Sequence, residues 1–354
     1  MEKEAKNMEC LSKISKSTGL AFKDESKDNL RQRSTKQNET NGDDITPSDM
    51  MHELYERSEE FVHKVWDKVP CWSVVHHSML PQWLQDNEYL HNWHRPHLPS
   101  FAECFKSVFK LHSETGNIWT HLVGCIAFIY VMIYFLSVSP IVFEEKFIFS
   151  TFFLGAILCL GFSTLLHTLG CHSESSCKLF GKLDYCGISL LITGSCVPWF
   201  YYVFYCDYIS KIVYISMIVI LGTLTMVFSL YDKFGTSEYR TMRALSFVIF
   251  GMSAAIPAVH YMSIMDWNDQ VNTTAMQSVF LLAFLYVLGA GIYAARIPER
   301  LFPGKCDLWF QSHQIFHVLV VAGAFVTYYG LKELAVHRNE YTECGVVNIP
   351  LTSG

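Results

Sequence analysis

The sequence predicts an all-α membrane protein, a seven-transmembrane helix bundle preceded by a polar head. Hydrophobic residues make up 51% of the 354 positions, and the mean hydropathy is +0.21. Residues 1–49 hold 19 of the 60 charged residues, whereas residues 117–333 hold only 23 in 217 positions. This distribution excludes an ordinary globular enzyme and a wholly disordered chain. The formal charge of −6 argues against a nucleic-acid-binding protein, which would usually be basic.

Seven apolar stretches follow one another, each near the roughly 20 residues that a helix needs to cross about 30 Å of hydrocarbon. They cover about Ile118–Ser139, Phe147–Leu169, Asp184–Tyr205, Ile209–Tyr231, Met242–Ile264, Thr274–Arg296 and Gln311–Leu331. None alternates apolar and polar residues as membrane strands do. Pro198 and Pro257 lie inside spans, where neighbouring helices or cavity water can satisfy the freed carbonyls.

Lys and Arg in the short loops predict the orientation of the bundle. The loops after the second, fourth and sixth spans together hold eight of these residues, whereas the loops after the first, third and fifth hold two. We therefore expect a cytoplasmic N-terminus and, after an odd number of spans, an extracellular C-terminus. This orientation is opposite to that of G-protein-coupled receptors. We expect a multi-pass protein of the plasma membrane.

Four regions follow from this topology. Residues 1–49 are expected to form a disordered cytoplasmic tail, residues 50–116 a cytoplasmic juxtamembrane region, residues 117–333 the transmembrane domain and residues 334–354 an extracellular tail. Within the second region, Phe101, Phe105 and Phe109 recur every four residues, which predicts one face of a short amphipathic helix. This helix either lies on the inner membrane surface or belongs to a small cytoplasmic subdomain packed on the bundle.

The twelve cysteines are scattered rather than paired in the pattern of secreted proteins. Those on the predicted reducing side are expected to be free thiols: Cys10, Cys71, Cys104, Cys171, Cys177 and Cys306. Cys206 and Cys344 are the candidates for a disulfide on the outer side, and we do not expect them to pair.

Metal-binding or charged side chains inside spans are costly and are therefore candidates for function. The predicted topology brings three such places to one depth. The second span ends at His167, the third begins at Asp184, and the seventh begins with His313 and His317. Because residues four apart lie on one helix face, His313 and His317 can bind one ion together. Ser163 lies on the same face as His167, one turn deeper.

Three imidazoles are one ligand short of a closed tetrahedral zinc site. A structural zinc usually has four protein ligands, whereas a catalytic zinc leaves a position for water and lowers its pKa to about 7. The pattern thus predicts a Zn²⁺ site of His167, His313 and His317, with Asp184 as general base and Ser163 positioning an imidazole or the substrate oxygen. Two alternatives stay open: Asp184 can cap its helix, and Ser163 can bond back to a helix carbonyl.

Other histidines and cysteines are weaker candidates. Three histidines have no partner at a matching depth in this topology: His112, His121 and His260. A second metal site between the second and third spans, at Cys171, His172 and Cys177, lacks an evident fourth ligand.

Several segments resemble the adiponectin receptors of the progestin and adiponectin receptor family. They are His112–His121, Lys182–Tyr185 with Gly187–Ile188, Val197–Trp199, Arg296–Lys305 and Ser312–His317, and the similarity runs from about His91 to Gly330. The resemblance implies seven helices, an inner N-terminus and a buried zinc held by His167, His313 and His317. It also implies that Asp184 lies beside the zinc-bound water, and that Ser163 belongs to the family's Ser-x-x-x-His pattern. Through the related alkaline ceramidases, it implies hydrolysis of the ceramide amide bond, linked to signalling in lipid and glucose metabolism.

The leading hypothesis is therefore a zinc-dependent membrane hydrolase of a ceramide-like lipid amide, regulated as a receptor. An extracellular protein hormone and a cytoplasmic adaptor bound to the N-terminal region are the expected protein partners. The alternative is a non-catalytic receptor in which a structural zinc clamps the second helix to the seventh. An ion or proton transporter is disfavoured, because it would need ionisable residues near mid-bilayer and these spans have almost none.

Overall fold

The computed structural model describes residues 72–340. The chain divides into two compact units between Ser73 and Val74, and all the helices that the structure describes lie in the second unit. Apart from one isolated bridge between Val75 and His94, the regular structure of the described residues is helical. Seven helical segments in this part of the chain are long and apolar enough to cross a membrane, which supports the predicted multi-pass bundle.

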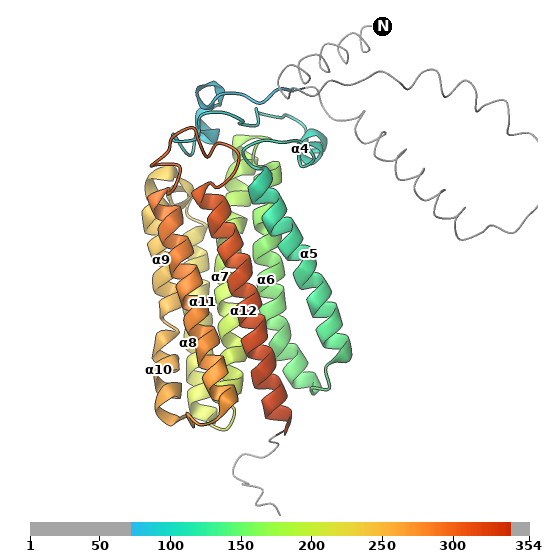
Figure 1. The fold of residues 1–354 in the computed structure, drawn as a ribbon, viewed down its shortest axis with the longest axis vertical. Coiled ribbons are helices and arrows are strands. Elements are labelled where there is room, and N and C mark those ends of the chain that lie inside the picture. The colour runs from blue at the N-terminus through green and yellow to red at the C-terminus, as the bar shows by residue number, and fades with distance from the viewer. Residues whose placement is uncertain (1–71, 341–354) are drawn as a thin grey trace, which may run out of the picture. The chain divides into compact units, whose positions relative to one another are not determined.

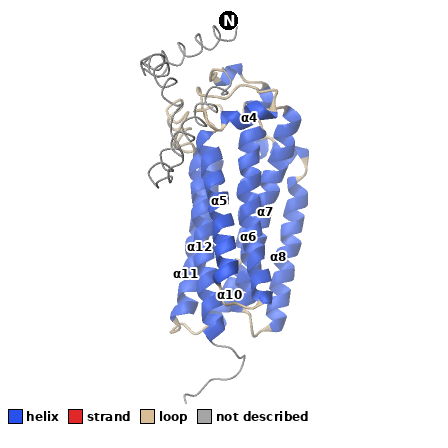
Figure 2. Ribbon diagram, turned by 90° about the vertical axis from the view of Figure 1, so that its right-hand side faces the viewer, coloured by secondary structure: helices blue, strands red, loops and turns tan. Residues whose placement is uncertain are grey.

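The long helices run side by side (Figures 1 and 2). They are α5 (Thr115–Val138), α6 (Phe143–Leu169), α7 (Glu174–Val203), α8 (Tyr208–Ser229), α9 (Arg240–Met252) with α10 (Ala255–Ile264), α11 (Gln270–Ala295) and α12 (Ser312–Glu340). The shorter elements are η1 (His77–Met79), η2 (Gln82–Leu84), α4 (Phe101–Ser107), η3 (Asp232–Gly235) and η4 (Ser237–Tyr239). The segment before α5 and the connection between α11 and α12 lie at one end of the bundle, and α12 ends at the other (Figure 1).

The fifth span consists of two helices rather than one. α9 ends at Met252 and α10 begins at Ala255, two residues before Pro257. Proline lacks an N–H, and its ring clashes with the carbonyl four residues earlier, here that of Ser253, so the helix breaks at this point. α7, in contrast, continues through Pro198.

α7 begins ten residues earlier than the apolar run that predicted it. Its N-cap is Ser173, whose hydroxyl accepts a hydrogen bond from the backbone N–H of Ser176 at 3.2 Å. Asp184 therefore lies about 15 Å along the helix from its start, at 1.5 Å per residue. The alternative that Asp184 caps this helix is therefore wrong. Glu174, Lys178 and Lys182 interrupt the apolar pattern in the first turns of α7, so the sequence did not reveal where the helix begins.

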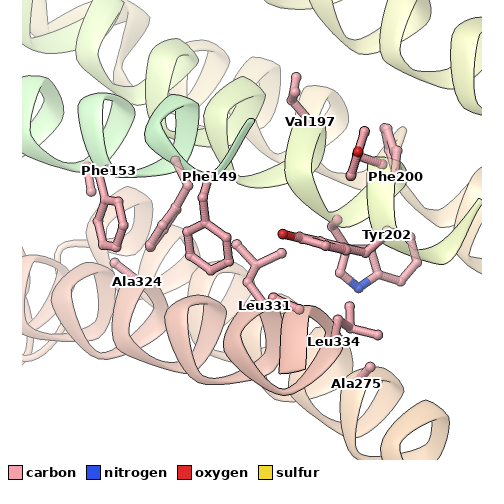
Figure 3. Packing of buried hydrophobic residues seen from close by; sticks show 14 of the residues in the cluster. Phe149, Phe153, Val197, Phe200, Tyr202, Ala275, Ala324, Leu331 and Leu334 are labelled. Atoms are coloured by element: carbon pink, nitrogen blue, oxygen red, sulfur yellow. The ribbon is translucent and has the colours of Figure 1, made fainter. Parts of the chain in front are cut away.

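Aromatic and aliphatic side chains fill the half of the bundle away from the segment before α5. Phe149 and Phe153 of α6 pack against Leu331 of α12 and Tyr202 of α7 (Figure 3). Glycines let α6 and α7 approach closely. A Cβ atom at Gly194 would lie 2.4 Å from the carbonyl oxygen of Thr151, so no side chain fits there.

α4 lies within the predicted amphipathic segment. Cys104 and Ser107 are completely buried, whereas Phe101, Phe105 and Phe109 are 47%, 51% and 56% exposed. The helix is thus anchored through its small residues, and its aromatic face points outward, as expected for side chains that enter a membrane surface. The predicted disorder of residues 1–49 lies outside the described residues, and α12 continues as a helix to Glu340.

The cysteine predictions have two outcomes. Cys104, Cys171, Cys177 and Cys306 are free thiols, as predicted, and Cys10 and Cys71 lie outside the described residues. Cys206 is disulfide-bonded, so the expectation that it stays unpaired is wrong. Cys206 lies between the end of α7 at Val203 and the start of α8 at Tyr208, and cysteine spacing alone did not reveal that it is paired.

Candidate metal centre

Three histidines from two helices converge at the end of the bundle near α4. His167 lies in the last turn of α6, and His313 and His317 lie in the first two turns of α12. Their ligand nitrogens all lie within 4.8 Å of one another, and His167 Nε2 is 3.2 Å from His313 Nε2. Within residues 72–340 this is the one group of three or more His, Cys, Asp or Glu that can hold a metal ion. The structure thus brings together the three ligands that the sequence predicted.

Hydrogen bonds to the outer ring nitrogens orient two of these imidazoles. His167 Nδ1 lies 2.7 Å from Glu114 Oε2, and His317 Nδ1 lies 3.2 Å from the carbonyl oxygen of Asn117. Carboxylate and carbonyl oxygens only accept, so Nδ1 carries the proton in each neutral ring. The lone pair of Nε2 then points at the cluster, which is the usual arrangement of a metal-ligating histidine.

The geometry of the cluster fits a transition metal. Two nitrogens bound tetrahedrally to zinc at about 2.0–2.1 Å are separated by about 3.3 Å, close to the 3.2 Å observed between His167 and His313. Without an ion, the bare Nε2 atom of His167 would face another imidazole nitrogen at this distance. Imidazole ligands suit zinc, copper, iron and nickel.

Glu114 is a site residue to which the sequence interpretation assigned no role. It immediately precedes α5, its side chain is 32% exposed, and its Oε2 atom also accepts from Asn117 Nδ2 at 2.9 Å. Burial alone would raise the pKa of Glu114, but the hydrogen bonds from His167 and Asn117 and the charge of Arg95 hold it well below its usual range. The available signal was its position: an acidic residue next to the inner end of the first span, at the predicted level of His167.

Three histidines that the topology left without partners do have them. The ring of His121 stacks on that of His317, with centroids 3.5 Å apart. The fully buried His112 ring lies 3.1 Å from the Ser107 carbonyl through Nε2 and accepts the backbone N–H of Glu114 through Nδ1. His260 Nδ1 lies 3.0 Å from the Tyr214 hydroxyl. The prediction was wrong because it compared depths but had no information on which helices are neighbours.

A cavity of about 920 Å³ opens beside the histidines. His167, His313 and Glu114 line it together with Asp184, which is 9% exposed. Ser163 is 1% exposed, and its hydroxyl has no hydrogen-bond partner among the described residues. The alternative that Ser163 bonds back to a helix carbonyl is therefore wrong. Ser163 lies on α6 one turn before His167. The unpaired hydroxyl of Ser163, the buried carboxyl group of Asp184 and the imidazole nitrogens of the three histidines are together a set of groups that suits a bound metal ion.

Comparison with known proteins identifies the family. Residues 109–328 match the haemolysin-III-related family. The chain is 53% identical over 312 residues to the adiponectin receptor protein of Drosophila melanogaster, covering 88% of this chain and 70% of that protein. It is 55% identical over 269 residues to progestin and adipoQ receptor-like protein 1 of Caenorhabditis elegans, covering 75% of this chain and 62% of that one. It is also 32% identical to heptahelical transmembrane protein 4 of Arabidopsis thaliana, covering 75% of this chain and 89% of the plant protein.

This protein therefore belongs to the haemolysin-III-related family of membrane proteins. Within that family it is similar, over most of its length, to adiponectin receptor and progestin and adipoQ receptor-like proteins, so the resemblance seen in the sequence is confirmed.

Proposed function

We propose that this chain is a zinc-dependent hydrolase of lipid amides, ceramidase-like in its chemistry and regulated as a receptor. One observation carries the proposal. Three metal-binding histidines and a buried carboxylate meet at one end of an apolar helix bundle, beside a cavity large enough for a lipid head.

Each residue of the site has a separate role in the proposed hydrolysis. His167, His313 and His317 would hold the ion, and Glu114 keeps His167 in the correct tautomer. Zinc, when bound, polarises a carbonyl and makes a water molecule acidic. Asp184 accepts the proton of the attacking water and delivers it to the amine nitrogen as the amide C–N bond breaks. Ser163, with no other partner for its buried hydroxyl, orients the Asp184 carboxylate.

The surroundings of the site favour an amphipathic substrate. The cavity wall carries ionisable side chains, among them Lys182, Asp232 and Arg240, whereas the long helices expose apolar side chains along their length. A lipid whose amide lies at headgroup depth could place that bond in the cavity and leave its acyl chains among the helices.

The proposal includes an orientation and protein partners. The excess of Lys and Arg in three loops supports a cytoplasmic N-terminus, and we place the protein in the plasma membrane. The names of the animal relatives support a protein hormone on the outer face, with a cytoplasmic adaptor bound to the N-terminal region. An N-terminal epitope tag should be stained in intact cells only after permeabilisation, and staining without it would reverse the orientation.

Asp184→Asn provides the test of catalysis. In purified full-length protein, this variant should keep its zinc by elemental analysis but release fatty acid from ceramide about 10²–10⁴-fold more slowly. His317→Ala should lose both properties. The matched control is Asp232→Asn, a 79% exposed carboxylate that lines the same cavity and pairs with Lys182. Undiminished turnover in Asp184→Asn would refute its role as base.

A purely structural zinc is the second candidate, and helix packing favours it. α12 packs on α5, α7 and α11, whereas α6 packs on α4, α5 and α7. An ion held by His167 and the α12 histidines would therefore join two helices that contact each other through side chains, such as Phe153 and Tyr328, rather than through closely packed backbones. On this reading, chelation should lower the thermal stability of the wild-type protein, and the pure protein should hydrolyse no lipid amide at any zinc concentration.

A further inference from the structure

Two buried thiols face each other on the same side of the bundle as the metal centre. Cys104 lies in α4, and Cys171 lies in the short connection between α6 and α7. Their Sγ atoms are 3.5 Å apart, and the residues are 0% and 2% exposed. Both are free thiols. Cys171 thus belongs to a thiol pair rather than to a metal site with His172, which stacks on Phe101 instead.

The environment makes the two thiols chemically different. The hydrogen bond between the two thiols and the positive charge of Arg95 lower the pKa of Cys171. The same hydrogen bond, together with burial, raises the pKa of Cys104 far above its usual range. A thiol with a lowered pKa beside a protonated thiol is the arrangement of an attacking cysteine and a resolving cysteine.

Arg95 is fixed in place by three hydrogen bonds. Its Nη1 atom donates to Ser107 Oγ at 2.6 Å and to the Thr168 carbonyl at 3.1 Å, and its Nη2 atom donates to the His167 carbonyl at 2.6 Å. Arg95 therefore joins α4 to the end of α6, the two places on either side of the thiol pair. Its charge is held near the sulfurs by contacts that do not involve them.

The two sulfur atoms also differ in their access to the cavity beside the metal centre. Cys171 is among the residues that line the cavity of about 920 Å³, whereas Cys104 is not. A small oxidant that enters the cavity therefore reaches the cysteine with the lowered pKa first.

We propose that Cys171 and Cys104 form a peroxide-sensitive redox pair. The Cys171 thiolate attacks hydrogen peroxide, the O–O bond breaks, and Cys171 sulfenic acid and hydroxide form. The Cys104 thiol then attacks the sulfenic sulfur, a disulfide forms, and water leaves. In total the two thiols lose two electrons and two protons, and one peroxide becomes two waters. The sulfur atoms must approach by about 1.5 Å to reach a bond length of about 2.05 Å.

The disulfide would lock α4 to the turn that follows His167. In the reduced protein the same elements are held by non-covalent contacts, among them the hydrogen bonds of Arg95 and the stacking of Phe101 on His172. The cytoplasmic placement in the proposed function would keep the pair reduced at rest, so that oxidation reports a rise in peroxide. The redox chemistry itself does not depend on hydrolase activity.

The test uses full-length protein in lipid nanodiscs, reduced and then freed of reductant. After hydrogen peroxide and alkylation of the remaining thiols, peptide mass spectrometry should find a Cys104–Cys171 cross-link within one chain that has lost two hydrogens and is reversed by dithiothreitol. Cys104→Ser should abolish the cross-link and leave a sulfenic acid on Cys171 that dimedone traps. Cys177→Ser is the matched control, because Cys177 lines the same cavity, and it should leave the cross-link yield unchanged.

Three results would overturn the proposal. Full alkylation of both cysteines after peroxide would show that the pair does not react. A cross-link from Cys171 to Cys177 would assign the resolving role elsewhere. Dimedone on Cys104 in Cys171→Ser, with none on Cys171 in Cys104→Ser, would reverse the two roles. If Cys104→Ser does not fold, the wild-type cross-link and Cys104→Ala carry the same test.

Discussion

Glu114→Gln measures how strongly a carboxylate outside the ligand set supports the metal centre. Glutamine keeps the size of the side chain and one acceptor oxygen at the 2.7 Å contact with His167 Nδ1, but it removes the negative charge that makes Nε2 a better ligand. Partners of this kind usually account for 10–100-fold in metal affinity. Because the Glu114 side chain is 32% exposed, water screens part of its charge. We therefore expect the lower half of that range, about 10–30-fold, or about 1.4–2.0 kcal/mol.

The assay is zinc competition between the purified full-length protein and a chelating zinc indicator. Glu174→Gln is the matched control, since Glu174 lines the same cavity but pairs with Lys178 on the helix surface at 2.7 Å. It should change the zinc affinity less than about twofold, as expected for an exposed pair. Thermal unfolding of both metal-free variants separates a folding defect from a loss of affinity. An unchanged zinc affinity in Glu114→Gln, or an equal loss in the control, would refute the orienting role.

Three further outcomes can be measured by thermal unfolding of the purified protein. Gly194→Ala should cost about 1–3 kcal/mol, because its Cβ would lie 2.4 Å from the Thr151 carbonyl oxygen, whereas Gly181→Ala, in open space, should cost little. Burial lowers the pKa of His112 to about 3 from 6.5, so between these values the unfolded chain binds a proton that the folded chain does not. Stability should therefore fall as pH drops from about 6.5 toward 3, by up to about 1.4 kcal/mol per pH unit from this group, and His112→Gln should flatten that dependence in metal-free protein. Chelation should lower the melting temperature of the wild-type protein but not that of His317→Ala, since a ligand stabilises only a fold that binds it.

The sequence predicts the spans and the three histidines well because both follow from strong local signals. An apolar run of about 20 residues has few stable alternatives to a membrane helix, and the four-residue spacing of His313 and His317 places both on one face. His167 lies at the end of its apolar run, and the end of α6 at Leu169 agrees with that reading.

The site residues that the sequence did not predict depend on contacts between different helices. Glu114 and His121 belong to α5 or its cap, and their roles come from the packing of α5 beside α6 and α12. That packing is set by tertiary contacts, about which loop charges and hydropathy carry no information. The start of α7 was missed for a different reason: Glu174, Lys178 and Lys182 interrupt the apolar pattern of its first ten residues, and hydropathy detects the membrane rather than the helix.

The part of α7 that precedes Asp184 also explains how a site with ionisable side chains can exist at one end of an apolar helix bundle. A carboxylate in hydrocarbon would be strongly disfavoured. Asp184, however, lies where the extended turns of α7, the segment before α4 and the start of α12 enclose a cavity, so Asp184 faces protein and the cavity rather than lipid. Within that wall, Arg240 forms an ion pair with Asp86 of the segment before α4, and the Arg240 guanidinium stacks 4.4 Å from the ring of Tyr293. A helix longer than the membrane requires, closed over by the preceding segment, thus makes a carboxyl group and three imidazoles compatible with one end of a transmembrane bundle.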